Sequence, residues 1–319
     1  GFLTFPSLRP QATTAPGQPP PDELLNVYNF RAIRRSTRVY GIAGWPVSHS
    51  LSPRLHNAGF RAIGHDGVYL PLPIAAGDDE GASYASFKGT ILELLGDATL
   101  NFAGCSVTLP HKVNLLRLAR EQGWEIDPLG AEAGAANTLV VENGATRVFN
   151  SDITAIVACV ARAKSFARAL VLGAGGAARA AAVALRSTGA RVRISARDAA
   201  RSASLCADLG DGCETTPWEQ PVDSADELVV NCTPVGMRGG PAPEASPLGP
   251  ESLARLSSSA VVFDTVYTPR ETPLIRAARD AGLETISGER MFLLQASAQF
   301  QAWTGQPLPE LTDWRVAGE

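Results

Sequence analysis

A glycine-rich turn between an apolar run and an alanine-rich run constrains the fold of this chain more than any other feature. Gly173, Gly175 and Gly176 follow the apolar residues 169–172 and precede an expected helix over 177–188. Glycine lets the backbone turn tightly and approach a pyrophosphate, and the start of the following helix attracts its negative charge. The turn therefore predicts a dinucleotide site beside a parallel strand. The alternative is a glycine-rich turn that binds nothing.

The rest of the chain alternates between short apolar runs rich in β-branched or aromatic residues and longer helical stretches. We expect strands over 39–45, 68–74, 104–109, 169–173, 191–195, 228–232, 260–265 and 284–286. We expect helices over 53–63, 113–122, 177–188, 199–209, 272–281 and 289–303. Asn143-Gly144 predicts a hairpin between 137–142 and 147–150, and we expect 78–81 and 241–250 to be surface loops. This alternation predicts an α/β fold with parallel strands joined by helical crossovers.

The composition excludes several classes of protein. Hydrophobic residues make up 45% and charged residues 19% of the 319, and the net charge is -4, so we expect a globular protein without a nucleic-acid surface. No apolar run approaches the roughly 18 residues of a membrane span. The five cysteines and four histidines have no metal-ligand spacing. We therefore expect no metal site, no disulfide framework and a reducing intracellular setting.

The residues that follow the strand 191–195 bear on the choice of dinucleotide. NAD enzymes place an acidic residue here to bind the ribose hydroxyls, whereas NADP enzymes place an arginine near the 2′-phosphate. Arg197 favours NADP, and Arg201 lies one helical turn later. Asp198 would repel a phosphate if it pointed inward. The alternative is that Arg197 and Asp198 form a solvated surface pair.

Other polar residues stand at the ends of expected strands. Ser50 and Ser52 precede a helix, where they could bind a carboxylate or simply cap the helix. Lys112 lies just beyond a buried strand, where a lone lysine is usually only exposed. Asn137 and Asp152 flank the hairpin and could be turn residues. None of these residues is decisive alone.

Taken together and in order, the motifs of this chain resemble those of the shikimate dehydrogenase family. The motifs are Ser50-Leu-Ser52-Pro-Arg-Leu-His56-Asn57, Ser106-Val-Thr108-Leu-Pro-His-Lys112, Ala135-Ala-Asn137-Thr138, Asn150-Ser-Asp152, the turn from Gly173 to Arg179, Asn231-Cys-Thr-Pro-Val-Gly236-Met237, Asp264-Thr-Val-Tyr267 and the stretch from Gly288 to Gly305. The resemblance covers about residues 38–306. It is greatest to the plant-type bifunctional 3-dehydroquinate dehydratase/shikimate dehydrogenase.

The resemblance implies two α/β domains. The substrate-binding domain, with a mainly parallel sheet, would comprise 37–151 and 287–319, and the Rossmann-like NADP-binding domain would comprise 152–286. The active site would lie where the carboxyl ends of the strands meet. The implied reaction is the reversible reduction of 3-dehydroshikimate to shikimate with NADPH. The cytoplasm is the expected compartment, or a plastid if the source is a plant.

The resemblance also assigns roles to individual residues. Lys112 would give a proton to the developing alkoxide, and Asp152 would hold the lysine and bind a ring hydroxyl. Ser50, Ser52 and Tyr267 would bind the carboxylate. The residues implied for hydroxyl binding are Thr108, Asn137, Gln295 and Gln299. Those implied for the cofactor are Gly173, Ala174, Gly175, Gly176, Ala177, Arg197, Arg201, Thr233, Met237, Gly288 and Met291; for the two methionines, plain core packing is an equally good interpretation.

Residues 1–36 are interpreted as a tail and linker. Residues 1–5 and 14–18 resemble the last strand and substrate loop of a type I dehydroquinate dehydratase, so the chain resembles the back part of a longer protein that is fused to, or associated with, such a domain. The prolines of residues 1–22 oppose regular structure. Leu25, Val27, Tyr28 and Phe30 form an apolar cluster that we expect to dock on the substrate domain.

The chain departs from the family pattern at two places, and two alternatives remain open. Val148, Ser151 and Ala155 replace glycine, threonine and glycine beside Asp152, and Asp198 replaces threonine beside Arg197. One alternative is a quinate dehydrogenase, although Ser52 and Thr108 favour shikimate. The other is a non-catalytic sensor on the same fold, against which the intact Lys112 and Asp152 argue.

Overall fold

In the computed structural model of the chain, residues 19–48, 50–163 and 165–311 are described. They divide into two compact units. Among the described residues, unit 1 comprises 19–125, 138–148 and 296–311. Unit 2 comprises residues 126–137 and 149–295.

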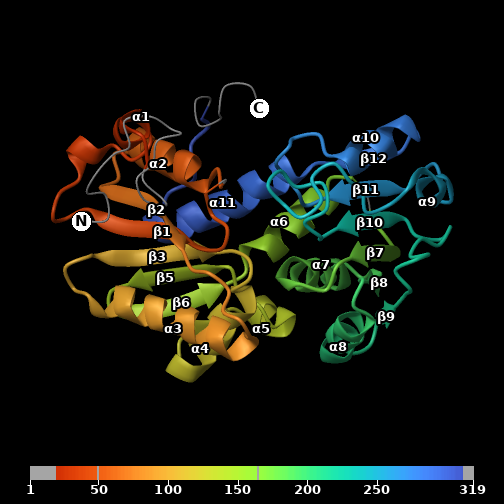
Figure 1. The fold of residues 1–319 in the computed structure, drawn as a ribbon, viewed down its shortest axis with the longest axis horizontal. Helices are drawn as coiled ribbons and strands as arrows, with labels where there is room; N and C mark the ends of the chain where they lie inside the picture. The colour runs from red at the N-terminus through yellow and green to blue at the C-terminus, as the bar shows by residue number, and fades with distance from the viewer. Residues whose placement is uncertain (1–18, 49, 164, 312–319) are drawn as a thin grey trace. The chain divides into compact units, whose positions relative to one another are not determined.

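Unit 1 contains a six-stranded mixed sheet in the order β2-β1-β3-β5-β6-β4 (Figure 1). Its strands are β1 (Arg38–Gly44), β2 (Gly67–Pro73), β3 (Phe102–Val107), β4 (Glu125–Ile126), β5 (Thr138–Glu142) and β6 (Ala145–Phe149). β1 pairs in parallel with both β2 and β3, whereas β5 runs antiparallel to β3. The predicted hairpin is therefore confirmed as β5–β6, with Asn143 and Gly144 at positive φ in its turn.

The helices of unit 1 are α1 (Pro21–Asn26), α2 (Ser52–Ala62), α3 (Glu80–Gly96) and α4 (Lys112–Gln122), with the 3₁₀ turn η1 (Phe30–Ala32). The prediction of a loop over 78–81 is wrong at its end, because α3 begins there. Asp79 caps α3 by accepting a hydrogen bond from the backbone N–H of Ala82 at 2.8 Å, as short acidic side chains do at helix starts.

An aromatic cluster fills the core of unit 1. Tyr40, Phe60 and Phe300 are fully buried, and the Phe60 and Phe300 rings stack with centroids 5.4 Å apart. Phe300 and Trp303 belong to the last helix, α11 (Gly288–Thr304). The Trp303 indole donates a hydrogen bond to the Leu139 carbonyl at 3.0 Å, so the end of α11 is fixed to β5.

The linker before β1 docks on unit 1, but not with all of the expected residues. Val27 and Tyr28 are buried against Val68 and Leu70, as the cluster prediction requires, and Leu24 joins them. Leu25 and Phe30 are 43% and 46% exposed, so their predicted docking is wrong. α1 begins at Pro21, which occupies the first turn of the helix, where the missing N–H of proline has no cost. The expectations for residues 1–18 lie outside the described residues.

Unit 2 contains a six-stranded sheet in the order β12-β11-β10-β7-β8-β9, parallel throughout. Its strands are β7 (Arg168–Leu172), β8 (Arg191–Ser195), β9 (Cys213–Thr215), β10 (Leu228–Asn231), β11 (Val261–Asp264) and β12 (Glu284–Ile286). Its helices, besides the start of α11, are α5 (Pro128–Ala133), α6 (Ser151–Val160), α7 (Gly176–Ser187), α8 (Ala199–Leu209), α9 (Pro250–Ala254) and α10 (Pro273–Asp280).

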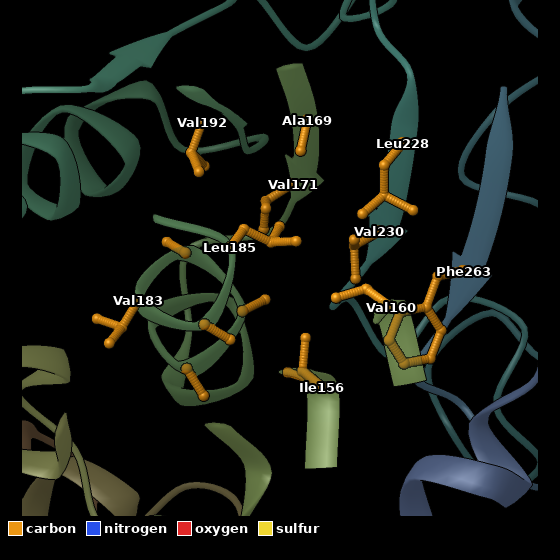
Figure 2. Packing of buried hydrophobic residues seen from close by; sticks show 14 of the residues in the cluster. Ile156, Val160, Ala169, Val171, Val183, Leu185, Val192, Leu228, Val230 and Phe263 are labelled. Atoms are coloured by element: carbon orange, nitrogen blue, oxygen red, sulfur yellow. The ribbon is translucent and has the colours of Figure 1, made fainter. Parts of the chain in front are cut away.

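The core of unit 2 is built from β-branched strand residues and an alanine-rich helix. Figure 2 shows Val171 of β7 and Val230 of β10 packed with Leu185 of α7 and Ile156 of α6. Ala178 of α7 is also fully buried. Small side chains let a helix approach a sheet closely, so the alanine-rich sequence of α7 holds the glycine-rich turn in place against β7.

Candidate active site

In unit 1, the loops that follow β1 and β3 are joined at the carboxyl end of the sheet. The Thr108 N–H donates to the Ala43 carbonyl at 2.9 Å, and the Trp45 N–H donates to the Leu109 carbonyl at 2.8 Å. A Cβ at Gly44 would lie 2.4 Å from the Thr108 side chain, so only glycine fits there. Since both loops lead directly into helices, this packing carries the two polar motifs of unit 1 to the same end of one sheet.

The first of these motifs provides Ser50 and Ser52 at the start of α2. The Ser50 hydroxyl accepts a hydrogen bond from the Ser52 N–H at 3.2 Å. Leu51, at the N-cap position, has no side chain that can cap the helix. Ser50 therefore satisfies one N–H at the start of α2 from the position before the N-cap, and its hydroxyl keeps its own proton to donate. Ser52 is 3% exposed.

The second motif places Lys112 as the first residue of α4. The neighbouring His111 is fully buried and holds this turn, with its Nε2 2.9 Å from the Ile74 carbonyl. The Asn114 amide donates to Nδ1 of His111 at 2.9 Å, so Nε2 must carry the proton that goes to Ile74. Burial lowers the pKa of His111, and the ring is therefore a neutral spacer that sets where Lys112 begins its helix.

Gln299 belongs to a buried polar chain in unit 1. The Tyr69 hydroxyl donates to Ser106 Oγ at 2.7 Å, and the Ser106 hydroxyl donates to Gln299 Oε1 at 2.7 Å. The Gln299 amide in turn donates to Thr138 Oγ1 at 3.0 Å. Gln299 is 1% exposed. This network links α11 to β3 and β5, and each member depends on the next for its hydrogen bond.

In unit 2, three of the expected residues meet around the start of α6. Asn137 Oδ1 accepts from both the N–H and the hydroxyl of Ser151, at 2.8 and 3.1 Å. The Ser151 hydroxyl also lies 3.4 Å from Gln295 Oε1. Asp152 follows in the first turn, is 5% exposed, and donates its N–H to Asn150 Oδ1 at 3.2 Å. A carboxylate in this position is stabilised by the helix dipole.

The glycine-rich turn lies between β7 and α7. Gly173 has φ +112°, a conformation that favours glycine, and its N–H donates to the Ser195 carbonyl at 2.7 Å. Gly175 is the N-cap of α7 and supplies no side-chain cap. A Cβ added to Gly175 would meet no atom within 4 Å. The helix start is therefore bare and approachable, as a backbone site for pyrophosphate requires.

The turn sits at the point where the strand order of unit 2 reverses. β7 has β8 on one side and β10 on the other, which is the position where open α/β sheets bind their ligands. Thr233 follows β10, and a Cβ at Gly173 would lie 3.4 Å from its side chain. Gly173 and Thr233 therefore lie together beside the switch point, where the sequence predicts a dinucleotide site.

Asp198 is directed to its own helix. It is the N-cap of α8, and its carboxylate accepts from the N–H groups of Ala200 and Arg201 at 3.1 and 3.2 Å. The Arg201 guanidinium lies 3.4 Å from the same carboxylate. Arg197 is exposed. The charge of Asp198 is therefore partly neutralised by the helix start and Arg201, which weakens its expected repulsion of a phosphate.

A buried polar network joins the loops after β10 and β11. The Thr233 hydroxyl donates to Asn231 Oδ1 at 2.7 Å, and the Asn231 amide donates to Asp264 at 2.9 Å. The Thr272 hydroxyl donates to the other oxygen of Asp264 at 2.6 Å. Burial raises the pKa of Asp264 to about 6. The network fixes the loop that contains Thr233.

The remaining expected residues cluster near the start of α11. Gly288 is the first residue of this helix. A Cβ there would lie 2.3 Å from the Val266 carbonyl oxygen, so the absence of a side chain lets the helix start lie close to the loop after β11. Tyr267 stacks on Phe292 with ring centroids 4.6 Å apart. Met291 is 6% exposed and packs in the core of unit 2, which agrees with its interpretation as a core residue. Met237 is half-buried.

Comparison with known proteins identifies the family of the chain. Residues 42–139 match the family model described as the shikimate dehydrogenase substrate binding domain. The chain is 37% identical to the shikimate dehydrogenase (NADP(+)) of Paramagnetospirillum magneticum, over 86% of this chain and 95% of that protein. The chain belongs to the shikimate dehydrogenase family.

Family relatives differ in length and in the names of their ligands. The chloroplastic bifunctional 3-dehydroquinate dehydratase/shikimate dehydrogenase of Arabidopsis thaliana is 34% identical over 99% of this chain, which spans only 52% of that relative. The Thermus thermophilus shikimate 5-dehydrogenase in complex with NADP(H) and shikimate has a TM-score of 0.69 and 30% identity, covering 86% of this chain and 95% of that one. The Corynebacterium glutamicum quinate dehydrogenase in complex with NAD has a TM-score of 0.70 and 28% identity, covering 85% and 95%.

Within this family fold, the residues that hold the site residues in place were not predicted from the sequence. His111 positions Lys112, Asn150 caps the helix of Asp152, and Asp264 anchors the loop of Thr233. Each lies inside a quoted motif, so the motif was identified from the sequence but the positioning role of the residue was not. Within the described parts of the chain, no group of three or more potential ligands could hold a metal ion, and no helix is long and apolar enough to cross a membrane.

Proposed function

We propose that this chain catalyses the NADPH-dependent, reversible reduction of 3-dehydroshikimate to shikimate. The observation that carries the proposal is the match to a shikimate dehydrogenase (NADP(+)) over 95% of that protein's length. A match of that extent includes both the sheet that carries Lys112 and the sheet that carries the glycine-rich turn. The two halves of a ketone reductase, one for substrate and one for cofactor, are thus contained in one chain.

The residues around the switch point of unit 2 fit a dinucleotide. The bare start of α7 offers backbone N–H groups to the pyrophosphate, and Gly175 has no Cβ to obstruct its approach. Arg197 would pair with the 2′-phosphate of NADP, since Asp198 is engaged by α8. When bound, NADPH supplies the hydride. The cofactor residues that we propose are Gly173, Ala174, Gly175, Gly176, Ala177, Arg197, Arg201, Thr233, Met237, Gly288 and Met291.

Lys112 and Asp152 are the proposed acid–base residues, on the basis of the family resemblance. As the ketone is reduced, negative charge develops on its oxygen, and a positioned cation that can also release a proton lowers the barrier. Lys112 in unit 1 would supply that proton. Asp152 in unit 2 would orient the lysine and bind a ring hydroxyl. His111 and Asn150 fix the two helix starts from which these side chains extend.

The proposed substrate residues divide by chemistry. Ser50, Ser52 and Tyr267 offer hydroxyl donors to the carboxylate. The side chains proposed to bind the ring hydroxyls are Thr108, Asn137, Gln295 and Gln299. Asn137 and Gln299 are almost fully buried and are held by hydrogen bonds with Ser151 and Thr138, so they would present their amides to the ring hydroxyls in a fixed geometry.

A single set of assays tests this proposal. The purified protein is incubated with shikimate or quinate and with NADP or NAD, and formation of the reduced cofactor is followed by absorbance. We expect the highest kcat/KM for shikimate with NADP. A preference for quinate would favour the alternative of a quinate dehydrogenase. The C. glutamicum quinate dehydrogenase has a fold similar to that of this chain. Binding of shikimate without turnover of either substrate would favour a sensor.

The setting of the enzyme is a further part of the proposal. We place the substrate-binding domain at 37–151 and 287–319 and the NADP-binding domain at 152–286. Residues 1–36 would link them to a dehydroquinate dehydratase, in the same polypeptide or as a partner, because 99% of the chain aligns with only 52% of the plant bifunctional relative. The compartment would be the cytoplasm, or a plastid in a plant. Dehydratase activity that copurifies with the protein from its natural source would test the link.

A further inference from the structure

Two cysteine side chains face each other at the edge of the second sheet. Cys206 lies near the end of α8, and Cys213 is the first residue of β9. Their Sγ atoms are 2.9 Å apart. Because a disulfide bond has an S–S distance of about 2.05 Å, a movement of about 1 Å would close the bond.

The segment between the cysteines accounts for this approach. Gly210 and Gly212 have φ values of +71° and +84°, in the left-handed region that favours glycine. These two residues reverse the chain, so that the end of the helix and the start of the strand lie side by side. The absence of CxxC spacing led to the expectation of no disulfide, but that spacing is a poor guide here, because a chain reversal of this kind brings together cysteines seven residues apart.

The position of the pair makes it accessible. Cys206 and Cys213 are both half-buried, whereas Cys105 and Cys159 are fully buried. β9 is the last strand of the sheet and pairs on one side only, with β8. A small oxidant can therefore reach the two sulfur atoms without unfolding the core.

We propose that Cys206 and Cys213 are a redox-active dithiol, which a low-molecular-weight disulfide such as oxidised glutathione converts reversibly to an intramolecular disulfide. The thiolate of one cysteine attacks the oxidant, forms a mixed disulfide and expels one molecule of reduced thiol. The second cysteine then loses its proton and attacks the protein sulfur of the mixed disulfide. This expels the second reduced thiol, so the protein loses two electrons and the oxidant gains them.

The surroundings of the two thiols bear on the rate of this exchange. Burial raises the pKa of both thiols. A hydrogen bond from Cys213 opposes this rise at Cys206, whereas the same hydrogen bond adds to it at Cys213. Because thiolates react and thiols do not, oxidation should be slow at neutral pH and faster at higher pH.

The bond would join α8 to an edge strand of three residues. Such a strand opens easily, since it has one hydrogen-bonded neighbour and a short ladder. A crosslink restricts the open state and so stabilises the closed one. The dithiol is thus a modification site that sets how firmly β9 is held. This inference goes beyond the proposed dehydrogenase function and does not depend on it.

The test is to equilibrate the folded wild-type protein with oxidised glutathione, alkylate free thiols and measure the intact mass. We expect a loss of two hydrogen atoms without a retained glutathione. Trypsin cannot separate the cysteines, because no Lys or Arg lies between residues 201 and 238. A protease that cleaves before aspartate cuts at Asp208 and Asp211, so a linked pair of peptides would identify the bond.

Variants and reversal complete the experiment. The Cys232→Ser variant should still form the bond, whereas Cys206→Ser and Cys213→Ser should not. Oxidation should raise the melting temperature of the wild type by a few degrees, and dithiothreitol should reverse it. Separate alkylation of Cys206 and Cys213 after equilibration, a stable glutathione adduct on Cys206, or a link to another cysteine would each overturn the proposal. These readouts use the wild type, so they stand even if a variant fails to fold.

Discussion

His56 predicts an acid sensitivity of unit 1 that can be assigned to one side chain. The ring is fully buried, stacks on Tyr69 with centroids 4.6 Å apart, and contacts Phe300 and Trp303. Neither ring nitrogen has a hydrogen-bond partner among the described residues. Burial lowers the pKa of His56 to about 3, because nothing in this aromatic cluster compensates a positive charge for its lost hydration.

The sign and size of the effect follow from linkage. In the unfolded chain a histidine has a pKa of about 6.5, so on acidification the unfolded state takes up the proton first. Above pH 6.5 the ring is neutral in both states and His56 does not affect the unfolding free energy. As the pH falls from 6.5 to 3, the unfolding free energy decreases progressively, because only the unfolded state binds the proton. At pH 5 the unfolded state has gained about 2 kcal/mol from this one residue.

The assay is urea unfolding of the wild type and of His56→Leu at pH 7.5 and pH 5, followed by tryptophan fluorescence. Between these pH values the wild type should lose about 2 kcal/mol more unfolding free energy than the variant. Burial also lowers the pKa values of His65 and His111, but both residues are present in both proteins and their effects cancel in the difference. Equal pH dependence in the two proteins would refute the reasoning.

Three further predictions concern the proposed sites and the linker. Lys112→Ala should lower kcat by about 10²- to 10⁴-fold and leave the NADP dissociation constant unchanged; near-normal turnover would remove the proton-donor assignment. Arg197→Leu should weaken NADP binding and spare NAD, as measured by titration of both; equally tight NAD and NADP binding by the wild type would mean that Asp198 sets the preference. Deleting 1–20 should leave activity and melting temperature nearly unchanged. Extending the deletion through Phe30 should destabilise the protein by a few kcal/mol, since Leu24, Val27 and Tyr28 lose their buried contacts; equal behaviour of the two truncations would contradict this interpretation.

The sequence predicted most elements of regular structure because their hydrophobic periods are strong. β8 and α8 have the predicted bounds, and most other elements begin and end within one or two residues of the prediction. The failure at α3 is instructive. Tyr84, Phe87, Ile91 and Leu94 are buried along it at the three- and four-residue spacing of a helix. Gly81 and Gly89, which are poor helix formers, obscured a pattern that the sequence does contain.

The site was predictable as motifs but not as a network. Glycine-rich turns and helix caps depend on neighbours in the chain, so Gly173 and Gly175 could be identified from local sequence. Partners such as Ser106 and Gln299 are 193 residues apart, and no local rule pairs them. The docking of the linker failed in part for a similar reason: α1 turns Leu24 inward and leaves Leu25 exposed, and the helical phase of so short a segment cannot be read from composition.

The return of α11 to unit 1 has a consequence for how the chain matures on the ribosome. All strands of the first sheet have been synthesised by residue 149, but Phe300 and Trp303 complete its aromatic cluster. The intervening chain supplies nearly all of unit 2. Domains generally fold as units as they emerge, and contacts between distant residues form late. Part of the core of the first sheet therefore stays exposed while the second sheet is synthesised, until Phe300 and Trp303 emerge and cover it.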